Sequence, residues 1–177
     1  MTMKQVDPGV EVAVPVMDAA NPPNDLASAV KMSPPTDEDM SLVASLRASS
    51  DPWKSRGETQ EESLQALTQL RPFLHVAKLQ GQAVGYVTVE RDGPVPGAAY
   101  MRNIVVRPEL RKQGLGMVLL NHGVQTARDM YRKTLALRVD PANGPAVSFY
   151  RKAGFTTVAT VVSKKSGKLR LLMSREL

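Results

Sequence analysis

The chain has 177 residues, of which 42% are hydrophobic, and a formal net charge of +6. This is enough for one compact domain with a modest extension and too little for two full domains. The absence of cysteine excludes disulfides and a thiolate nucleophile, and with only His75 and His122 available we expect no metal site. No signal peptide or long apolar run is present, so we expect a cytoplasmic protein without membrane contact.

The charge is distributed unevenly along the chain. Residues 1–50 carry 3 basic and 7 acidic side chains (net −4), residues 51–100 carry 5 and 6 (net −1), and residues 101–177 carry 15 and 4 (net +11). A basic segment is typical of nucleic-acid-binding proteins, but aromatic residues for base stacking make up only 5% of the chain and no nucleic-acid motif occurs. Nucleic-acid binding therefore ranks third among the functions considered below.

Residues 1–28 contain four prolines and little helical or strand periodicity, which indicates an extension in front of the domain. One short strand is predicted within it, at residues 10–16. We expect the extension to be ordered, and a role in docking onto a protein partner is one interpretation of it.

Regular patterns begin near Ala29. A short strand at 29–33 precedes a helix with Thr36 as N-cap, and a second helix at 58–70 carries leucines on one face. The remaining predicted elements are a hairpin with strands at 72–79 and 83–91, a strand at 98–106, a helix from a glycine turn to about Tyr131, a strand at 134–139, a loop with a short helix at 141–154, and a final hairpin with strands at 155–163 and 169–177.

This order predicts an α/β (α+β) fold with a mixed, mostly antiparallel sheet of about seven strands and about four helices on both faces. The helix that joins the strands at 98–106 and 134–139 is a crossover connection. Those two strands are therefore predicted to be parallel.

The glycine turn "RKQGLG", Arg111 to Gly116, stands between a strand and a helix. It is not a Walker loop, because Met117 and Val118 follow where Lys and Ser or Thr are needed, and it lacks the third glycine of the dinucleotide-binding pattern. Two interpretations remain: backbone N–H groups that hold a phosphate-like anion at a helix N-terminus, or a turn that only allows close packing.

A second motif narrows this choice. Arg111, Gly114 and Gly116 fit the pattern Arg-x-x-Gly-x-Gly. The pattern Asn-x-x-Ala-x-x-x-Tyr-x-x-x-Gly-Phe is met by Asn143, Ala146, Tyr150, Gly154 and Phe155. With this spacing and element order, residues 29–177 resemble the GNAT superfamily of N-acetyltransferases, whose fold has a splayed parallel strand pair at the centre of the sheet. Pro52–Trp53 adds a weak similarity to the N-terminal acetyltransferases of ribosomal proteins.

The resemblance implies acetyl-CoA as acetyl donor, with its pyrophosphate on the glycine turn. Its pantetheine would pair with the strand at 104–106 as an added β-strand, and Val106 N–H would face the thioester oxygen. Asn143 would contact the pantetheine arm, and Tyr150 would protonate the leaving thiolate. The implied cofactor-binding residues are Ile104, Val105, Val106, Arg111, Lys112, Gln113, Gly114, Leu115, Gly116, Met117, Asn143 and Tyr150, and the implied catalytic residue is Tyr150.

The expected reaction is direct attack of a primary amine on the thioester in a ternary complex, the acceptor being a peptide or protein N-terminus, a lysine or a small amine. The alternative is a module of the same fold that binds a partner and has lost catalysis. Taken by themselves, Asn143 and Tyr150 also fit a helix cap and a core aromatic.

A general base is missing from the pattern. Many members of the superfamily have a Glu on one of the two central strands, where this chain has Tyr100 and Arg138. The acids near the expected site are Glu58, Glu90, Asp92 and Asp140. Deprotonation at pH 7 costs about 4.6 kcal/mol for a lysine and about 1.1 kcal/mol for an α-amine, so a site without a strong base favours a weakly basic amine.

Overall fold

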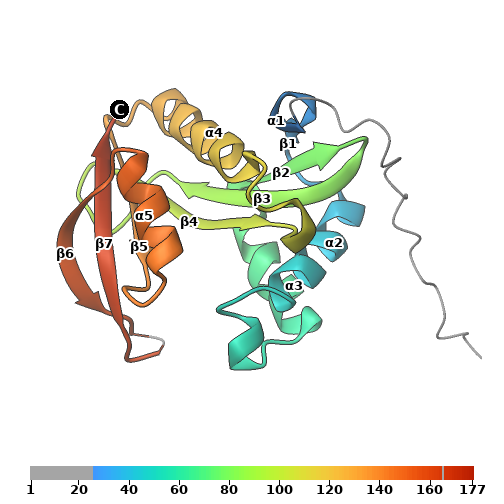
Figure 1. The fold of residues 1–177 in the computed structure, drawn as a ribbon, viewed down its shortest axis with the longest axis horizontal. Helices are drawn as coiled ribbons and strands as arrows, with labels where there is room; N and C mark the ends of the chain where they lie inside the picture. The colour runs from blue at the N-terminus through green and yellow to red at the C-terminus, as the bar shows by residue number, and fades with distance from the viewer. Residues whose placement is uncertain (1–25, 165) are drawn as a thin grey trace, which may run out of the picture.

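The computed structural model describes residues 26–164 and 166–177, so the strand and the docking role predicted for residues before Leu26 lie outside it. Seven strands form one sheet in the order β1-β2-β3-β4-β5-β7-β6 (Figure 1). The strands are β1 (Lys31–Ser33), β2 (Leu74–Leu79), β3 (Gln82–Glu90), β4 (Ala99–Val106), β5 (Thr134–Val139), β6 (Thr156–Val162) and β7 (Leu169–Glu176). All neighbours are antiparallel except β4 and β5, which confirms the predicted fold class and the predicted parallel pair.

Helices cover both faces of the sheet (Figure 1). They are α1 (Leu26–Ala29), α2 (Asp37–Ala48), α3 (Gln60–Leu70), α4 (Leu115–Asp129) and α5 (Gly144–Lys152). Residues of α1, α4 and α5 pack into one buried cluster, whereas α2 and α3 pack into another on the opposite face. Within the described part of the chain, every helix is too short or too polar to cross a lipid bilayer.

The helices α2 and α3 both begin at capping boxes. The Thr36 hydroxyl accepts from Asp39 N–H at 3.2 Å, and Asp39 Oδ2 accepts from Thr36 N–H at 2.8 Å. Thr59 and Glu62 repeat this arrangement with the same two distances at the start of α3. Each box satisfies two N–H groups that a helix start leaves without partners, which fixes where α2 and α3 begin.

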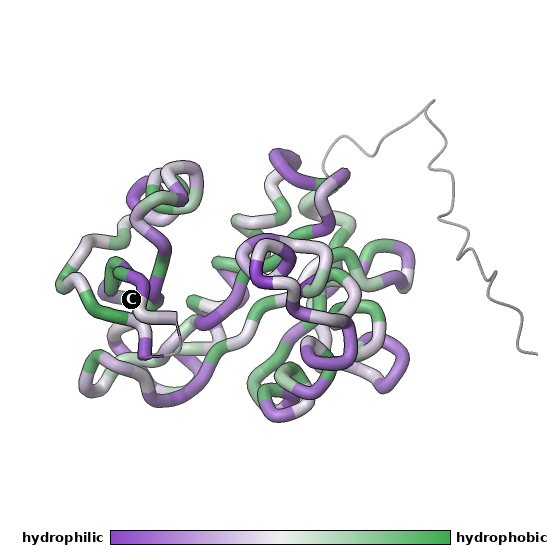
Figure 2. Tube along the Cα trace, turned by 90° about the horizontal axis from the view of Figure 1, so that it is seen from below, coloured by the Kyte–Doolittle hydropathy of each residue, from purple (hydrophilic) through white to green (hydrophobic). Residues whose placement is uncertain are grey.

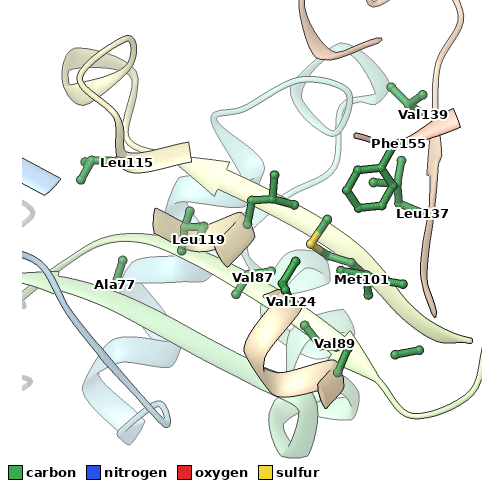
Figure 3. Close-up of a cluster of buried hydrophobic side chains, with 14 of the residues drawn as sticks. Ala77, Val87, Val89, Met101, Leu115, Leu119, Val124, Leu137, Val139 and Phe155 are labelled. Atoms are coloured by element: carbon green, nitrogen blue, oxygen red, sulfur yellow. The ribbon is translucent and has the colours of Figure 1, made fainter. Parts of the chain in front are cut away.

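The larger core lies between the sheet and α4 (Figure 3). Leu119 and Val124 of α4 meet Val87, Met101 and Leu137 of the central strands there. Gly123 lets α4 approach the sheet, because a Cβ at this position would lie 3.0 Å from the Met101 sulfur. Along the helices, short runs of hydrophobic residues alternate with short runs of hydrophilic residues, as expected for helices with one buried face (Figure 2).

The parallel pair at the centre of the sheet is short. Only Ala99–Met101 of β4 pair with Leu135–Leu137 of β5, although β4 continues for five more residues to Val106. Beyond that point β4 keeps its partner β3 and loses β5, so one side of its backbone opens at the middle of the molecule.

The two ends of the sheet differ from the sequence predictions in detail. Residues 26–28, which the sequence assigns to the extension, belong to the four-residue helix α1, and Leu26 is buried. The first strand begins at Lys31 rather than at Ala29. At the other end β6 is an edge strand; its seven residues are uncharged and none is buried.

Candidate active site

The glycine turn presents unpaired backbone donors at the start of α4. Lys112 and Gly114 adopt left-handed backbone angles, with φ of +60° and +83°, and Gly114 is an N-cap without a side chain. Hydrogen bonds into the turn begin with Met117 N–H, which donates to Gly114 O at 3.0 Å. The N–H groups of residues 112–116 donate to no other described residue, so they are available to an anion at the positive end of the helix.

Arg111 ties this turn to the open end of β4. Its Nε donates to Val106 O at 3.2 Å, and its Nη2 lies 3.5 Å from the Ser50 hydroxyl, beyond the end of α2. The guanidinium therefore bridges the turn, the end of β4 and the α2 side of the sheet. In this position it also adds positive charge next to the free N–H groups.

The end of β4 offers backbone groups on its open side. Arg107 N–H donates to Val84 O of the β3 side at 2.8 Å. Because bonding directions alternate along a strand, Val105 also faces β3, whereas Ile104 and Val106 face the gap left by β5. The groups open there are the N–H and C=O of Ile104 and the N–H of Val106, since Val106 O accepts from Arg111. An extended ligand could pair there as an additional strand.

Tyr150 lies on α5 and packs against the same buried cluster as Ile104 and Val106 of β4. It is partly buried and packs edge-to-face against Phe149 and Phe155, at centroid distances of 5.3 and 5.9 Å. Burial raises the pKa of Tyr150 to about 12, so its hydroxyl keeps its proton at neutral pH. Phe149 also approaches the turn, because a Cβ on Gly116 would lie 3.6 Å from its ring.

Asn143 caps the start of α5, which is the structural role its sequence position also allows. It is the N-cap of α5, and its Oδ1 accepts from Ala146 N–H at 3.2 Å. The cap sets the start of α5 and thereby the position of Tyr150, seven residues later.

Every acid considered as a base is held by an arginine. Glu58 pairs with Arg47 at 2.6 Å, Glu90 with Arg102 at 2.7 Å, and Asp140 with Arg170 at 2.9 Å. Asp92 pairs with Arg132. Each of the four carboxylates is thus engaged by a guanidinium instead of being open to a substrate amine.

Tyr100 and Arg138, which stand where many GNAT proteins have Glu, do come together. The Arg138 guanidinium lies 5.9 Å from the Tyr100 ring centroid. Burial raises the pKa of Tyr100, although the positive charges of Arg138 and Arg102 act in the opposite direction. Tyr100 is therefore a poor base at neutral pH.

Sequence reasoning missed two side-chain groupings. His75 and His122 face each other across β2 and α4 with ring centroids 4.6 Å apart, and the Arg47 guanidinium lies 4.5 Å over the Trp53 ring. The partners are 47 and 6 residues apart, and no local motif marks either contact. In residues 26–164 and 166–177, acids and histidines form no group of three that could hold a metal ion.

Comparisons with known proteins agree with this geometry. Residues 41–155 match the model of the acetyltransferase (GNAT) family. A protein of Bacillus subtilis (strain 168) named "Putative [ribosomal protein bS18]-alanine N-acetyltransferase" is 29% identical over 128 residues, which are 66% of this chain and 74% of that protein.

Among solved structures, Ard1 from Thermoplasma volcanium superposes with a TM-score of 0.70 at 21% identity, covering 84% of this chain and 98% of the other. The PaiA N-acetyltransferase from Thermoplasma acidophilum, solved in complex with coenzyme A, superposes with a TM-score of 0.64 at 15% identity, covering 84% and 99%.

The chain belongs to the acetyltransferase (GNAT) family. It is an acetyl-CoA-dependent acyltransferase, and the glycine turn with the open end of β4 fits the anionic and extended parts of that donor.

Proposed function

We propose that this protein is an N-acetyltransferase that moves the acetyl group of acetyl-CoA to a primary amine by direct attack in a ternary complex. The observation that carries the proposal is the continuity between the unpaired N–H groups of residues 112–116 and the open side of β4 at Ile104 and Val106. These backbone groups lead from an anion site to the fork between β4 and β5, and Tyr150 packs against the same buried cluster as Ile104 and Val106.

Different residues of this chain have different roles in the proposed reaction. The turn and Arg111 bind the pyrophosphate, and the backbone of residues 104–106 orients the extended arm; the remaining turn residues Lys112, Gln113, Leu115 and Met117 belong to the same cradle. Bound acetyl-CoA supplies the activated acetyl group. The Val106 N–H points into the gap, where it can stabilise negative charge on an oxygen. Tyr150 holds a proton on its Oη that it can donate to a departing thiolate.

The acceptor is best described as a weakly basic amine. The name of the Bacillus subtilis relative gives an alanine of ribosomal protein bS18 as its acceptor. In this chain the four nearby acids are all ion-paired, so an α-amine, which is partly neutral at pH 7, is a better acceptor than a lysine.

The same ion pairs leave a second function to consider, a module of this fold that binds acetyl-CoA without turning it over. No described residue offers an unpaired carboxylate at the fork, which is the observation in its favour. The retained Tyr150 favours catalysis.

Two measurements test the proposal together. A thermal shift with acetyl-CoA tests the cradle, and release of free thiol with panels of short peptides and small amines tests turnover. The proposal predicts stabilisation and acetylation of peptides with small N-terminal residues before lysine-containing peptides blocked at their N-terminus. No shift at millimolar acetyl-CoA would refute the cradle, and a shift without turnover of any amine would favour the binding module.

A further inference from the structure

Two arginines mark the point where β4 and β5 separate. Pairing between the strands ends at Met101 and Leu137, and the next residues are Arg102 and Arg138. Their guanidinium carbons lie 5.3 and 5.9 Å from the centroid of the Tyr100 ring. Two cations therefore flank one aromatic ring at the fork between β4 and β5, where the proposed acetyl-CoA site ends.

This group lies on the sheet face opposite α4. Leu137 and Val139 of β5 belong to the core under α4, so Ala136 and Arg138, which alternate with them, point to the other face. Ala136 and Tyr100 form a small buried cluster of their own there. An acceptor that approaches the fork from this face passes the two guanidinium groups.

The charges at the fork do not balance. Arg102 donates to Glu90 Oε2 through Nε at 3.2 Å and through Nη2 at 2.7 Å, so its charge is neutralised. Arg138 is exposed and forms no ion pair with any residue of the described chain. One positive charge therefore remains free beside the Tyr100 ring.

The geometry points to an acceptor amine that carries a carboxylate, with Arg138 as the residue that selects it. The inference rests on the proposed amine acetylation and specifies its substrate class. A planar guanidinium binds a carboxylate through two parallel hydrogen bonds, and the aromatic ring beside it restricts its orientation. The same free charge disfavours acceptors whose other groups are cationic, such as polyamines.

The experiment compares two acceptor pairs that differ in one charge: L-alanine with L-alaninamide, and the C-terminally amidated dipeptides Ala-Glu and Ala-Gln. The readout is kcat/KM for the carboxylate member divided by that for its neutral partner. This ratio is compared between wild type and variants, so differences in amine basicity cancel. In Arg138→Ala we expect it to fall about fivefold for at least one pair, the size of an exposed charged contact. Arg138→Lys should retain part of the preference, and Arg138→Glu should reverse it.

Arg128→Ala is the matched control. Arg128 is an exposed arginine of α4, on the other side of the sheet, and its removal lowers the net charge equally. An unchanged ratio in Arg138→Ala would overturn the inference. So would an equal loss for both members of each pair, because that would indicate a general role in folding or turnover.

Failure of the proposed function would look different. Wild type would then bind acetyl-CoA in the thermal shift but acetylate neither member of either pair. In that case calorimetry with the coenzyme A-saturated protein compares N-acetyl-L-alanine with N-acetyl-L-alaninamide as bound products. Equal binding by wild type, or a preference that survives Arg138→Ala, would overturn the assignment of Arg138 without turnover being needed.

Discussion

Tyr150 carries the clearest prediction at the scale of single residues. Its hydroxyl is protonated at neutral pH because burial raises its pKa to about 12, and its ring packs against Phe149 and Phe155. We expect Tyr150→Phe to lower kcat about a hundredfold through loss of proton transfer, while the Kd of acetyl-CoA changes little because the ring remains.

The matched control is Tyr131→Phe, since Tyr131 is 91% exposed and its hydroxyl has no place in the site. The pH profile supplies a second test: because the raised pKa keeps Tyr150 protonated, its own ionisation should cause no loss of kcat below about pH 10. An unchanged kcat in Tyr150→Phe would remove this residue from the mechanism.

Glu58 supports stability. Its side chain and that of Arg47 are only 12% and 8% exposed, and Glu58 also accepts a hydrogen bond from the Ser63 hydroxyl at 2.8 Å. Glu58→Gln removes the negative charge and leaves a buried guanidinium unbalanced, which costs about 3 kcal/mol. Urea unfolding measures this loss, with the exposed Glu61→Gln on α3 as control. If Glu58 were instead the catalytic base, its variant would keep stability and lose kcat.

The glycine turn is best tested as an element through two variants. Gly114 needs its left-handed angle of +83°, so Gly114→Ala should cost about 1 kcal/mol of stability before any ligand is added. At Gly116 a Cβ would meet only the Phe149 ring at an ordinary 3.6 Å, so Gly116→Ala should fold normally. A loss of acetyl-CoA affinity in Gly116→Ala, measured by calorimetry, would then report close approach of the ligand to the backbone. Unchanged affinity would assign both glycines to local structure alone.

The contact between β2 and α4 should make stability depend on pH. Burial lowers the pKa of His75 below 6.5. Burial also lowers the pKa of His122, repulsion from His75 adds to this shift, and Asp129 opposes it in part. Both imidazoles are thus neutral in the folded state above pH 6.5. Their contribution is present above pH 6.5 and is lost as the pH falls through the lowered folded values, because the unfolded state binds protons first.

Melting temperatures between pH 5 and pH 8 measure this dependence. His122→Gln should flatten the acidic part of the curve, and His75→Gln should do the same, because either change removes one of two facing rings. Curves parallel to wild type in both variants would contradict the assignment.

Helices and strands could be predicted from the sequence where residues close together in the chain determine them. Thr36 with Asp39, and the leucine spacing of α3, mark helices whose caps and buried faces lie within one stretch of chain. The helix α1 was missed because four residues are too few for a periodic signal. The chain order also predicted the parallel pair, since a helix between two strands allows few topologies.

The site was predictable in part for the same reason. Both GNAT motifs are local, whereas the partners of Glu58, Glu90 and Asp140 lie 11, 12 and 30 residues away and meet them only in the folded chain. Sequence therefore identified these acids as candidate bases, and only the fold revealed the arginines that occupy them.

At the scale of the whole molecule, segments of opposite net charge meet within the described residues. Arg111 reaches Ser50 beyond α2, and Lys78 of β2 pairs with Asp39 of α2 at 2.7 Å, so basic and acidic segments interleave. We therefore expect ligand binding to depend more on single cations without an ion pair in the described residues, such as Arg138, than on the net charge of a sequence segment.

We also expect the proposed binding of acetyl-CoA along the open side of β4 to make the protein's lifetime depend on the acetyl-CoA concentration. A ligand that binds only the folded chain adds about 2.7 kcal/mol of stability at one hundred times its Kd, and for a domain of this length that raises the melting temperature by about 8 °C. Scanning calorimetry and proteolysis at graded acetyl-CoA concentrations should follow this relation. When acetyl-CoA is scarce, the chain unfolds more often and proteases reach it sooner, so its abundance would follow the carbon supply of the cell.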